Sequence, residues 1–371
     1  MRFIVFRSKF CIFVATFGKI FTACMMEKKN IWFIVNPISG TGDKKRIVEL
    51  IPSYMDEAKF SCSIKYTEHR GHAAAYAKDA VRRGVDVVVA VGGDGTVNEV
   101  ARSLVHSETA LGIIPCGSGN GLARHLNIPM NAEGALKVLA ECQIETLDYG
   151  NINDIPFFCT CGVGFDAFVS SKFAQSGKRG LLSYIENTLR EGLKYKPETY
   201  EVEIDGELQR HKAFLIACAN ANQYGNNFYI APHASMSDGL MDVTIMEPFN
   251  LIEAPQIAIQ LVNKTITQNS RIKSFQCRSV KIHRPEPGVI HFDGEPKDAG
   301  CDLSVALIPK GIRMVVNNQP QLYTSPLLRV FSDLYADMND ELASLKNDIK
   351  ESQHRIQSIN QSLLRRLRPR K

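Results

Sequence analysis

The chain has 371 residues, which is enough for two domains and an appended segment. Hydrophobic residues make up 44% of the sequence and charged residues 22%, a balance typical of a soluble globular protein. This composition excludes collagen, intrinsic disorder and a multispan membrane protein for the bulk of the chain. The formal net charge of +5 is compatible with an anionic partner but too small to indicate nucleic acid, so we expect no nucleic-acid partner.

Residues 1–29 are interpreted as an N-terminal extension. Four cationic residues precede the first acidic one, Glu27, and only nine uncharged residues separate Lys9 from Lys19, about half of a membrane span. Lys19 also interrupts the apolar region that a signal peptide needs. We expect a non-native segment upstream of a start at Met25 or Met26; a surface-lying membrane anchor and an export signal are the alternatives.

From residue 30 to about 150, predicted strands and helices alternate. The apolar run 31–35 predicts a strand buried on both faces, and the valine-rich run 85–91 predicts a central one. Further strands are expected at 62–67 and 111–115, and helices around 47–51 and at 73–83, 98–105 and 121–126. This series predicts an α/β domain with a doubly wound, mostly parallel sheet.

Residues 151–320 have a different pattern of predicted secondary structure, with more strands and fewer helices than residues 30–150. Strands are expected at 157–160, 200–204, 213–219, 242–246, 279–283, 289–292 and 303–307, and helices at 181–194 and 252–262. This pattern predicts a second, mainly antiparallel β domain.

Residues 326–371 predict a helical, coiled-coil-like tail. Apolar positions from Met338 to Leu363 are separated alternately by four and three residues, with Ser352 as one polar interruption, and Arg365 to Lys371 form a basic end. We expect the helix either to fold back on the body or to pair with a second copy, giving a homo-oligomer.

Ten cysteines are scattered through the chain without a CxxC pair. This spacing fits neither a disulfide framework nor a zinc site, so we expect free thiols in a reducing cytoplasm.

Three glycine-containing turns follow predicted strands. Gly92-Gly93-Asp94-Gly95-Thr96-Val97-Asn98-Glu99 follows the valine strand and opens a helix, where glycines and free backbone amides favour a phosphate. Pro115 to Gly121 and Asn36 to Lys44 occupy equivalent places after two other strands. Because the carboxyl ends of parallel strands meet at one sheet edge, the turns predict a ligand crevice there. Each turn could also be no more than a strand-to-helix connection, with Asp94 or Thr96 as a helix N-cap.

These motifs together resemble the diacylglycerol kinase catalytic-domain family, which includes bacterial lipid kinases and sphingosine kinases. The resemblance covers about residues 30–318 and depends on Asn36-Pro37-x-Ser39-Gly40, Gly92 to Glu99, and Pro115-x-Gly117-Ser118-Gly119-Asn120. It implies ATP in an inter-domain cleft. The implied nucleotide contacts are Asn36, Gly40, Thr67, Gly92, Gly93, Asp94, Gly95, Thr96, Asn98, Glu99, Gly117, Ser118 and Asn120.

The resemblance also implies a metal and a catalytic acid in the second domain. Mg²⁺ is expected at an Asp-Gly-Leu turn, with the carboxylate of Asp238 and the backbone carbonyls of Ser235 and Leu240 as ligands. The Asp-Gly-Glu motif gives Asp293 as the expected general base, with Glu295 beside it. Taken alone, Asp-Gly-Glu is a common hairpin turn and Asp-Gly-Leu a common turn before a strand.

The predicted reaction is transfer of the γ-phosphate of ATP to a lipid hydroxyl. Such an acceptor implies peripheral contact of a cytoplasmic protein with the inner membrane face, aided by the basic tail. Two alternatives stay open: an NAD kinase-like enzyme, although its Gly-Ser-Thr-Ala-Tyr segment is not found in this sequence, and a non-catalytic membrane adaptor.

Overall fold

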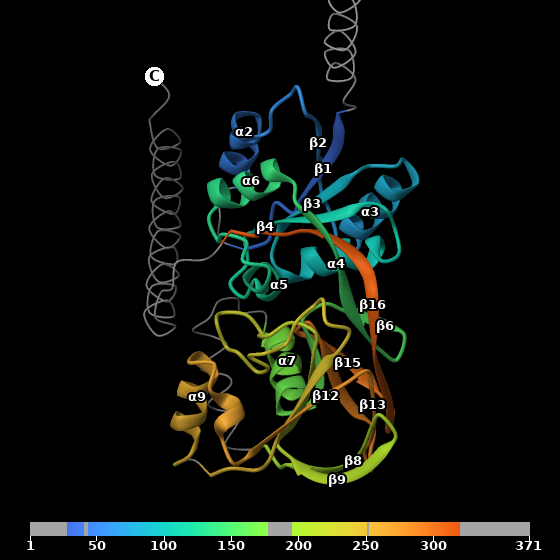
Figure 1. Ribbon diagram of the computed structural model, residues 1–371, viewed down its shortest axis with the longest axis vertical. Coiled ribbons are helices and arrows are strands. Elements are labelled where there is room, and N and C mark those ends of the chain that lie inside the picture. The colour runs from blue at the N-terminus through green and yellow to red at the C-terminus, as the bar shows by residue number, and fades with distance from the viewer. Residues whose placement is uncertain (1–27, 41–43, 177–194, 251, 320–371) are drawn as a thin grey trace, which may run out of the picture.

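The computed structural model describes residues 28–40, 44–176, 195–250 and 252–319 (Figure 1). The expected helix at 181–194, the tail 326–371 and nearly all of the N-terminal extension lie outside these residues. Two domains are stacked along the long axis of the molecule, with the N-terminal domain at the top of Figure 1.

The first domain alternates strands and helices as the sequence predicts. The strands are β1 (Lys29–Val35), β2 (Phe60–Tyr66), β3 (Val87–Gly92), β4 (Ala110–Pro115) and β5 (Ile144–Ile152). The helices are α2 (Lys44–Tyr54), α3 (His72–Arg82), α4 (Asp94–Leu104), α5 (Gly121–His125) and α6 (Ala132–Glu141).

The first-domain sheet is parallel, which confirms the predicted architecture. Its order is β2-β1-β3-β4, and every residue of β3 and β4 is buried, as expected for strands covered on both faces. Helices α3 and α4 pack against each other, and so do α2 and α6. Helix α6 was not predicted; its N-cap is Asn131, whose side chain accepts a hydrogen bond from the amide of Gly134.

The second domain is mainly antiparallel, also as predicted. Its strands are β6 (Ile155–Phe157), β7 (Thr160–Gly164), β8 (Glu198–Ile204), β9 (Glu207–Ala213), β10 (Leu215–Ala219), β11 (Met241–Met246), β12 (Ile272–Cys277), β13 (Ser279–His283), β14 (Gly288–Phe292), β15 (Glu295–Ala299) and β16 (Asp302–Val315). Its helices are α7 (Phe165–Ser176), α9 (Ala254–Val262) and the short 3-10 helix η1 (Ile266–Gln268).

The strands of this domain form two sheets around one core. One sheet has the order β12-β11-β10-β7-β14-β15, and the other contains β16, β13, β8 and β9. Side chains such as Val163 and Ile216 from the first sheet and Val280 and Val305 from the second share one buried cluster. The second domain is therefore a β-sandwich with its apolar core between the sheets.

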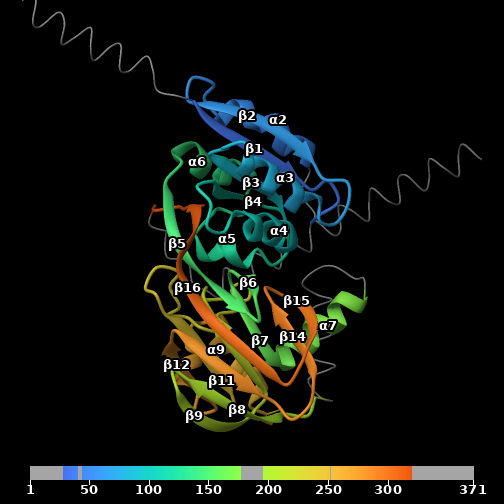
Figure 2. The same cartoon turned by 90° about the vertical axis from the view of Figure 1, so that its right-hand side faces the viewer.

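Two long strands, β5 and β16, connect the domains (Figure 2). Strand β16 pairs with β13 and β5 in antiparallel fashion and joins β4 in the first-domain sheet at Met314. Its register against β5 shifts between Ile308 and Ile312, where Lys310 has a positive φ of 50°. The expected strand at 303–307 is thus the start of a longer one, and the expected boundary near residue 150 falls inside β5.

The expected strand at 157–160 is wrong as a single element. Strand β6 ends at Phe157 and β7 begins at Thr160. The amides of residues 158, 159 and 160 donate to the carboxylate of Asp293. A side chain thus takes the place of a neighbouring strand, and the ladder breaks there.

Candidate active site

The loop after β1 lies against the two other glycine turns. Gly40 has a positive φ of 64°, and a Cβ there would overlap the carbonyl of Cys116 in the turn after β4. Asn36 Nδ2 donates to Oγ1 of Thr96, on the first turn of α4, at 3.1 Å. A Cβ on Gly92 would lie 2.6 Å from the same hydroxyl oxygen. Glycine is therefore required at positions 40 and 92 by close packing between loops.

The turns after β3 and β4 are locked together through Asp94. A Cβ on Gly117 would lie 2.8 Å from the Cα of Gly93, so the two backbones touch. The carboxylate of Asp94 accepts hydrogen bonds from the amides of Asn120 and Gly121, both at 2.9 Å. Burial raises the pKa of Asp94, and the two amides oppose that shift. Both oxygens of Asp94 thus serve the neighbouring turn.

The N-terminus of α4 is open to an anion. Its N-cap is Gly93, and no side chain among the described residues makes a capping hydrogen bond there, so neither Asp94 nor Thr96 acts as the cap. Gly95 is exposed, and a Cβ there would meet no atom within 4 Å. Uncapped amides and the helix dipole together favour a phosphate at this point.

The other expected nucleotide contacts are spread around this end of the sheet. Asn98 is buried, and its Nδ2 has no hydrogen-bond partner among the described residues. Both carboxylate oxygens of Glu99 accept from the amide of Gly71, at 3.1 Å. Thr67 is buried at the end of β2, and Ser118 is exposed. Thr67 and Ser118 thus lie after different strands, at one edge of the sheet.

The Asp-Gly-Glu motif forms the hairpin between β14 and β15. Asp293 and Gly294 have positive φ values of 50° and 80°, as a two-residue turn of type I′ requires. The carboxylate of Asp293 accepts from the amides of Phe158, Cys159 and Thr160 at 2.9, 2.7 and 3.2 Å. Burial raises the pKa of Asp293 to about 6, although these amides and the guanidinium of Arg102 oppose the rise. The side chain of Asp293 is thus engaged in holding a bend of the backbone.

Glu295 points toward the first domain. Its Oε1 lies 3.4 Å from Nη1 of Arg102 on α4, and its Oε2 lies 3.7 Å from Nη2 of Arg70 in the loop before α3. Its side chain is 27% exposed, so it is reachable from solvent. Of the two carboxylates of the motif, Glu295 is the one that lies against the helix carrying the glycine turn.

The hairpin and the glycine turns meet around Cys159. Burial raises the pKa of this thiol well above its usual range, and the nearby carboxylates of Asp293 and Asp94 add to the shift. A Cβ on Gly121 would lie 3.4 Å from its Sγ. Asp94 and Gly121 of the glycine turns and Asp293 of the hairpin therefore lie near one thiol at the boundary between the domains.

The expected metal turn lies beside β5. Asp238 is exposed and accepts from the amide of Leu240 at 3.0 Å, while Gly239 donates to Oδ2 of Asp148 at 2.9 Å. The Oγ atoms of Ser235 and Ser237 lie 3.2 Å apart. No group of three or more His, Cys, Asp or Glu side chains in the described ranges is placed to hold a metal.

Three polar residues at these sites were missed by sequence reasoning: Arg102, Asp148 and Asp242. Asp242 lies on β11, and its Oδ2 is buried without a partner among the residues described. Burial raises the pKa of Asp242, and the nearby Asp238 contributes to the rise. None of the three belongs to a short motif, so only the folded chain brings them to the site.

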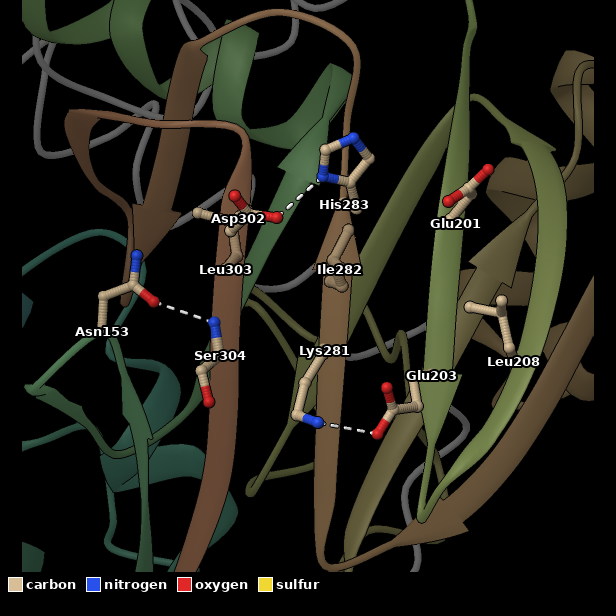
Figure 3. Close-up of a pocket in the computed structure, with 10 residues that line it drawn as sticks. All are labelled: Asn153, Glu201, Glu203, Leu208, Lys281, Ile282, His283, Asp302, Leu303 and Ser304. Carbon is tan, nitrogen blue, oxygen red and sulfur yellow. Dashed lines mark hydrogen bonds and ion pairs between the residues drawn. The ribbon is translucent and has the colours of Figure 1, made fainter.

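A surface groove on the second domain is separate from these residues (Figure 3). It crosses β8, β9, β13 and β16, where His283 pairs with Asp302 and Lys281 with Glu203. Among the residues that the structure describes, none from the glycine turns or the hairpin lines it. We assign it no part in the chemistry.

Comparison with known proteins identifies the family. Residues 30–152 match the model of the diacylglycerol kinase catalytic domain, and residues 159–316 match the YegS C-terminal NAD kinase beta sandwich-like domain. Residues 30–152 belong to the diacylglycerol kinase catalytic-domain family. Both motif sets, the glycine turns and the hairpin, fall inside the matched ranges.

Several curated relatives cover most of the chain. A diacylglycerol kinase of Bacillus subtilis is 29% identical over 72% of this chain and 90% of its own length. A protein of Enterobacter named "Probable lipid kinase YegS-like" is 28% identical over 67% and 84%. An uncharacterized protein of Synechocystis is 28% identical over 78% and 70%.

A solved structure supports the fold. A diacylglycerol kinase structure from Bacillus anthracis superposes with a TM-score of 0.63 at 21% identity, covering 79% of this chain and 98% of that one. At this identity the likeness concerns the fold alone. Among the described helices, none combines the length and the apolar character needed to cross a bilayer.

Proposed function

We propose that this chain transfers the γ-phosphate of ATP to a hydroxyl group of a lipid. The observation that carries the proposal is the position of Glu295, which comes from the second domain and contacts Arg102 of α4. The first turn of that same helix offers uncapped amides to an anion. Membership of a family of kinases supports this assignment.

The triphosphate would bind at the edge where the three glycine turns meet. The amides at the start of α4 would hold phosphate oxygens, and Gly95 leaves room for them. Asn36 and Asp94 would keep the neighbouring loops in place through the bonds described above. We retain the full set of proposed contacts: Asn36, Gly40, Thr67, Gly92, Gly93, Asp94, Gly95, Thr96, Asn98, Glu99, Gly117, Ser118 and Asn120.

Glu295 is the better candidate for the general base. Asp293 already accepts three amide hydrogen bonds, so using it as a base would break the bend at 158–160. Glu295 would accept the hydroxyl proton as the lipid oxygen forms a bond to the γ-phosphorus and the bond to the ADP oxygen breaks in line. Backbone amides would stabilise the charge on the transferred group.

Mg²⁺ is the metal whose ligand preference suits the turn before β11. The carboxylate of Asp238 and the carbonyls of Ser235 and Leu240 are hard oxygen donors. The Oδ2 of Asp242, which has no hydrogen-bond partner in the described ranges, is a further one nearby. A site with so few protein groups would leave waters on the ion. When bound, Mg²⁺ supplies positive charge that offsets the charge of the phosphates.

A lipid acceptor requires contact with a membrane surface. On α9 and just before it, Ile252 is 90% exposed and Ile259 is 54% exposed, so both side chains are available for contact with lipid. We propose peripheral association at the cytoplasmic face; the basic tail, outside the described residues, remains part of that hypothesis.

The experiment is a transfer assay with labelled ATP, Mg²⁺ and separate lipid acceptors in vesicles. We expect phosphate transfer to one lipid class and a loss of about 10²–10⁴ in kcat for Glu295→Gln, the usual contribution of a general base. ATP binding measured by calorimetry should persist. Glu207→Gln, at an exposed residue of the β8–β9 hairpin, is the matched control.

A second candidate is a kinase that acts on NAD. It is favoured by the match of residues 159–316 to a domain described as NAD kinase beta sandwich-like. Adding NAD as an acceptor in the same assay separates the two: labelled NADP would replace the lipid proposal. Transfer to no acceptor would leave the non-catalytic adaptor.

A further inference from the structure

We infer that Arg102 is a positioning residue for the phosphoryl transfer: it holds Glu295 in the reactive place across the domain boundary. The inference rests on the proposed function. No short motif includes Arg102, and the assignment comes from its contacts alone.

The guanidinium of Arg102 is held by the second domain although the residue belongs to the first. Its Nε donates to the carbonyl of Pro156 at 3.1 Å, and its Nη1 lies 3.4 Å from Glu295. Its Cζ lies 4.8 Å from the centroid of the Phe292 ring, in a cation–π arrangement. Three different groups from β6 and the β14–β15 hairpin therefore fix one side chain of α4.

The position of Arg102 on α4 links the base to the phosphate end of the helix. Arg102 is eight residues after Asp94, which corresponds to about 12 Å along an α-helix. Side chains on a helix generally lean toward its N-terminus, the direction in which the first turn lies. Arg102 thereby ties Glu295 to the element whose first turn would carry the γ-phosphate.

Stability alone does not explain this arginine. Its Nη2 is buried and has no hydrogen-bond partner in the part of the chain that the structure describes. A buried donor without a partner is unfavourable, and a lysine could pair with Glu295 without that penalty. The planar guanidinium of Arg102 meets both a carbonyl and a carboxylate, and it thereby fixes the orientation of the Glu295 carboxylate. A general base must be held in such a fixed orientation.

Arg70 provides a control on the same carboxylate. Its side chain is 90% exposed and lies 3.7 Å from Oε2 of Glu295, whereas the side chain of Arg102 is 22% exposed. Exposed ion pairs of this kind are weak because solvent screens them. If charge near Glu295 were all that mattered, the two arginines would behave alike.

The test is a double-mutant cycle in the full chain with Arg102→Gln and Glu295→Gln, read as kcat and KM for ATP. We expect Arg102→Gln to lower kcat by about 10²-fold, the loss typical of a misplaced catalytic group, with KM for ATP changed less than about threefold. In the Glu295→Gln background, Arg102→Gln should add no further loss, because its partner is gone. Arg70→Gln should change kcat less than about threefold.

Each other result has a definite meaning. A loss of kcat that persists in the Glu295→Gln background, or equal losses for Arg70→Gln and Arg102→Gln, would overturn the inference and leave the proposed function standing. Absence of phosphate transfer by the wild-type chain would overturn both. If Arg102→Gln fails to fold by its unfolding midpoint, Arg102→Lys takes its place in the cycle, since lysine keeps the charge and loses only the fork.

Discussion

Replacing Asp94 with asparagine should loosen the turn after β4 without touching the proposed base. Asp94 accepts two backbone amides, from Asn120 and Gly121, each at 2.9 Å. Asparagine has one acceptor oxygen, so one amide would face an NH₂ group instead. The variant removes one hydrogen bond and leaves a backbone donor without its acceptor.

The magnitude follows from these two contacts. A hydrogen bond to a charged group contributes about 1.5–3 kcal/mol, and the surviving bond becomes a neutral one worth about 0.5–1.5 kcal/mol. Removing a buried charge offsets part of this loss, because burial raises the pKa of Asp94. We expect a net local loss of about 2 kcal/mol, equivalent to a rise of about 30-fold in KM for ATP if the turn must close on the nucleotide.

Two measurements check this reasoning in the same variant. Hydrogen exchange at the amides of Asn120 and Gly121 should accelerate, and KM for ATP should rise while kcat changes little. Asp86→Asn is a matched control, because Asp86 accepts the amide of Asn30 at 2.7 Å far along the strands from the glycine turns. Unchanged exchange at these two amides would refute the structural role given to Asp94.

Three further changes have expected outcomes. Burial raises the pKa of Asp293 from 3.8 to about 6, so the contribution of Asp293 to the free energy of unfolding is greatest below about pH 4 and falls by about 2–3 kcal/mol as pH rises through 6. Urea unfolding of the wild type and of Asp293→Asn at pH 4.5–7.5 measures this change. A difference between the two proteins that does not depend on pH would contradict it. Gly40→Ala should destabilise by about 2–4 kcal/mol in thermal unfolding, whereas Gly84→Ala, with φ 67° and no neighbour within 4 Å, should lose only about 1 kcal/mol. Asp242→Asn should raise the Mg²⁺ concentration for half-maximal activity about tenfold; an unchanged Mg²⁺ titration would remove Asp242 from the proposed site.

The first domain was predictable because its signals are local. Apolar runs such as 31–35 are typical of strands buried on both faces of a parallel sheet, and the glycine turns mark the ends of the strands. The exact starts of the helices were harder to predict. Helix α4 begins at Asp94 rather than at residue 98, because most of the glycine-containing motif 92–99 lies within the helix.

The second domain and part of the site were harder to predict because their interactions are long-range. The prediction of a single strand at 157–160 was wrong because the carboxylate of Asp293, 135 residues away, accepts a hydrogen bond from the amide of Phe158. The motif Asp293-Gly294-Glu295 could be found by resemblance, but nothing in the sequence says which carboxylate faces the first domain. That depends on Arg102, whose contact with Glu295 forms only when the hairpin is folded.

The path of β16 also determines how the polypeptide can fold during synthesis. Its end joins β4 at Met314, so the first-domain sheet is incomplete until nearly all of the described chain has left the ribosome. Until then β4 is an open sheet edge with an entirely buried-type sequence, a template for unwanted pairing. Expression of residues 30–150 alone should therefore give aggregation-prone material. We also expect the nascent protein to bind a chaperone until β16 has been synthesised.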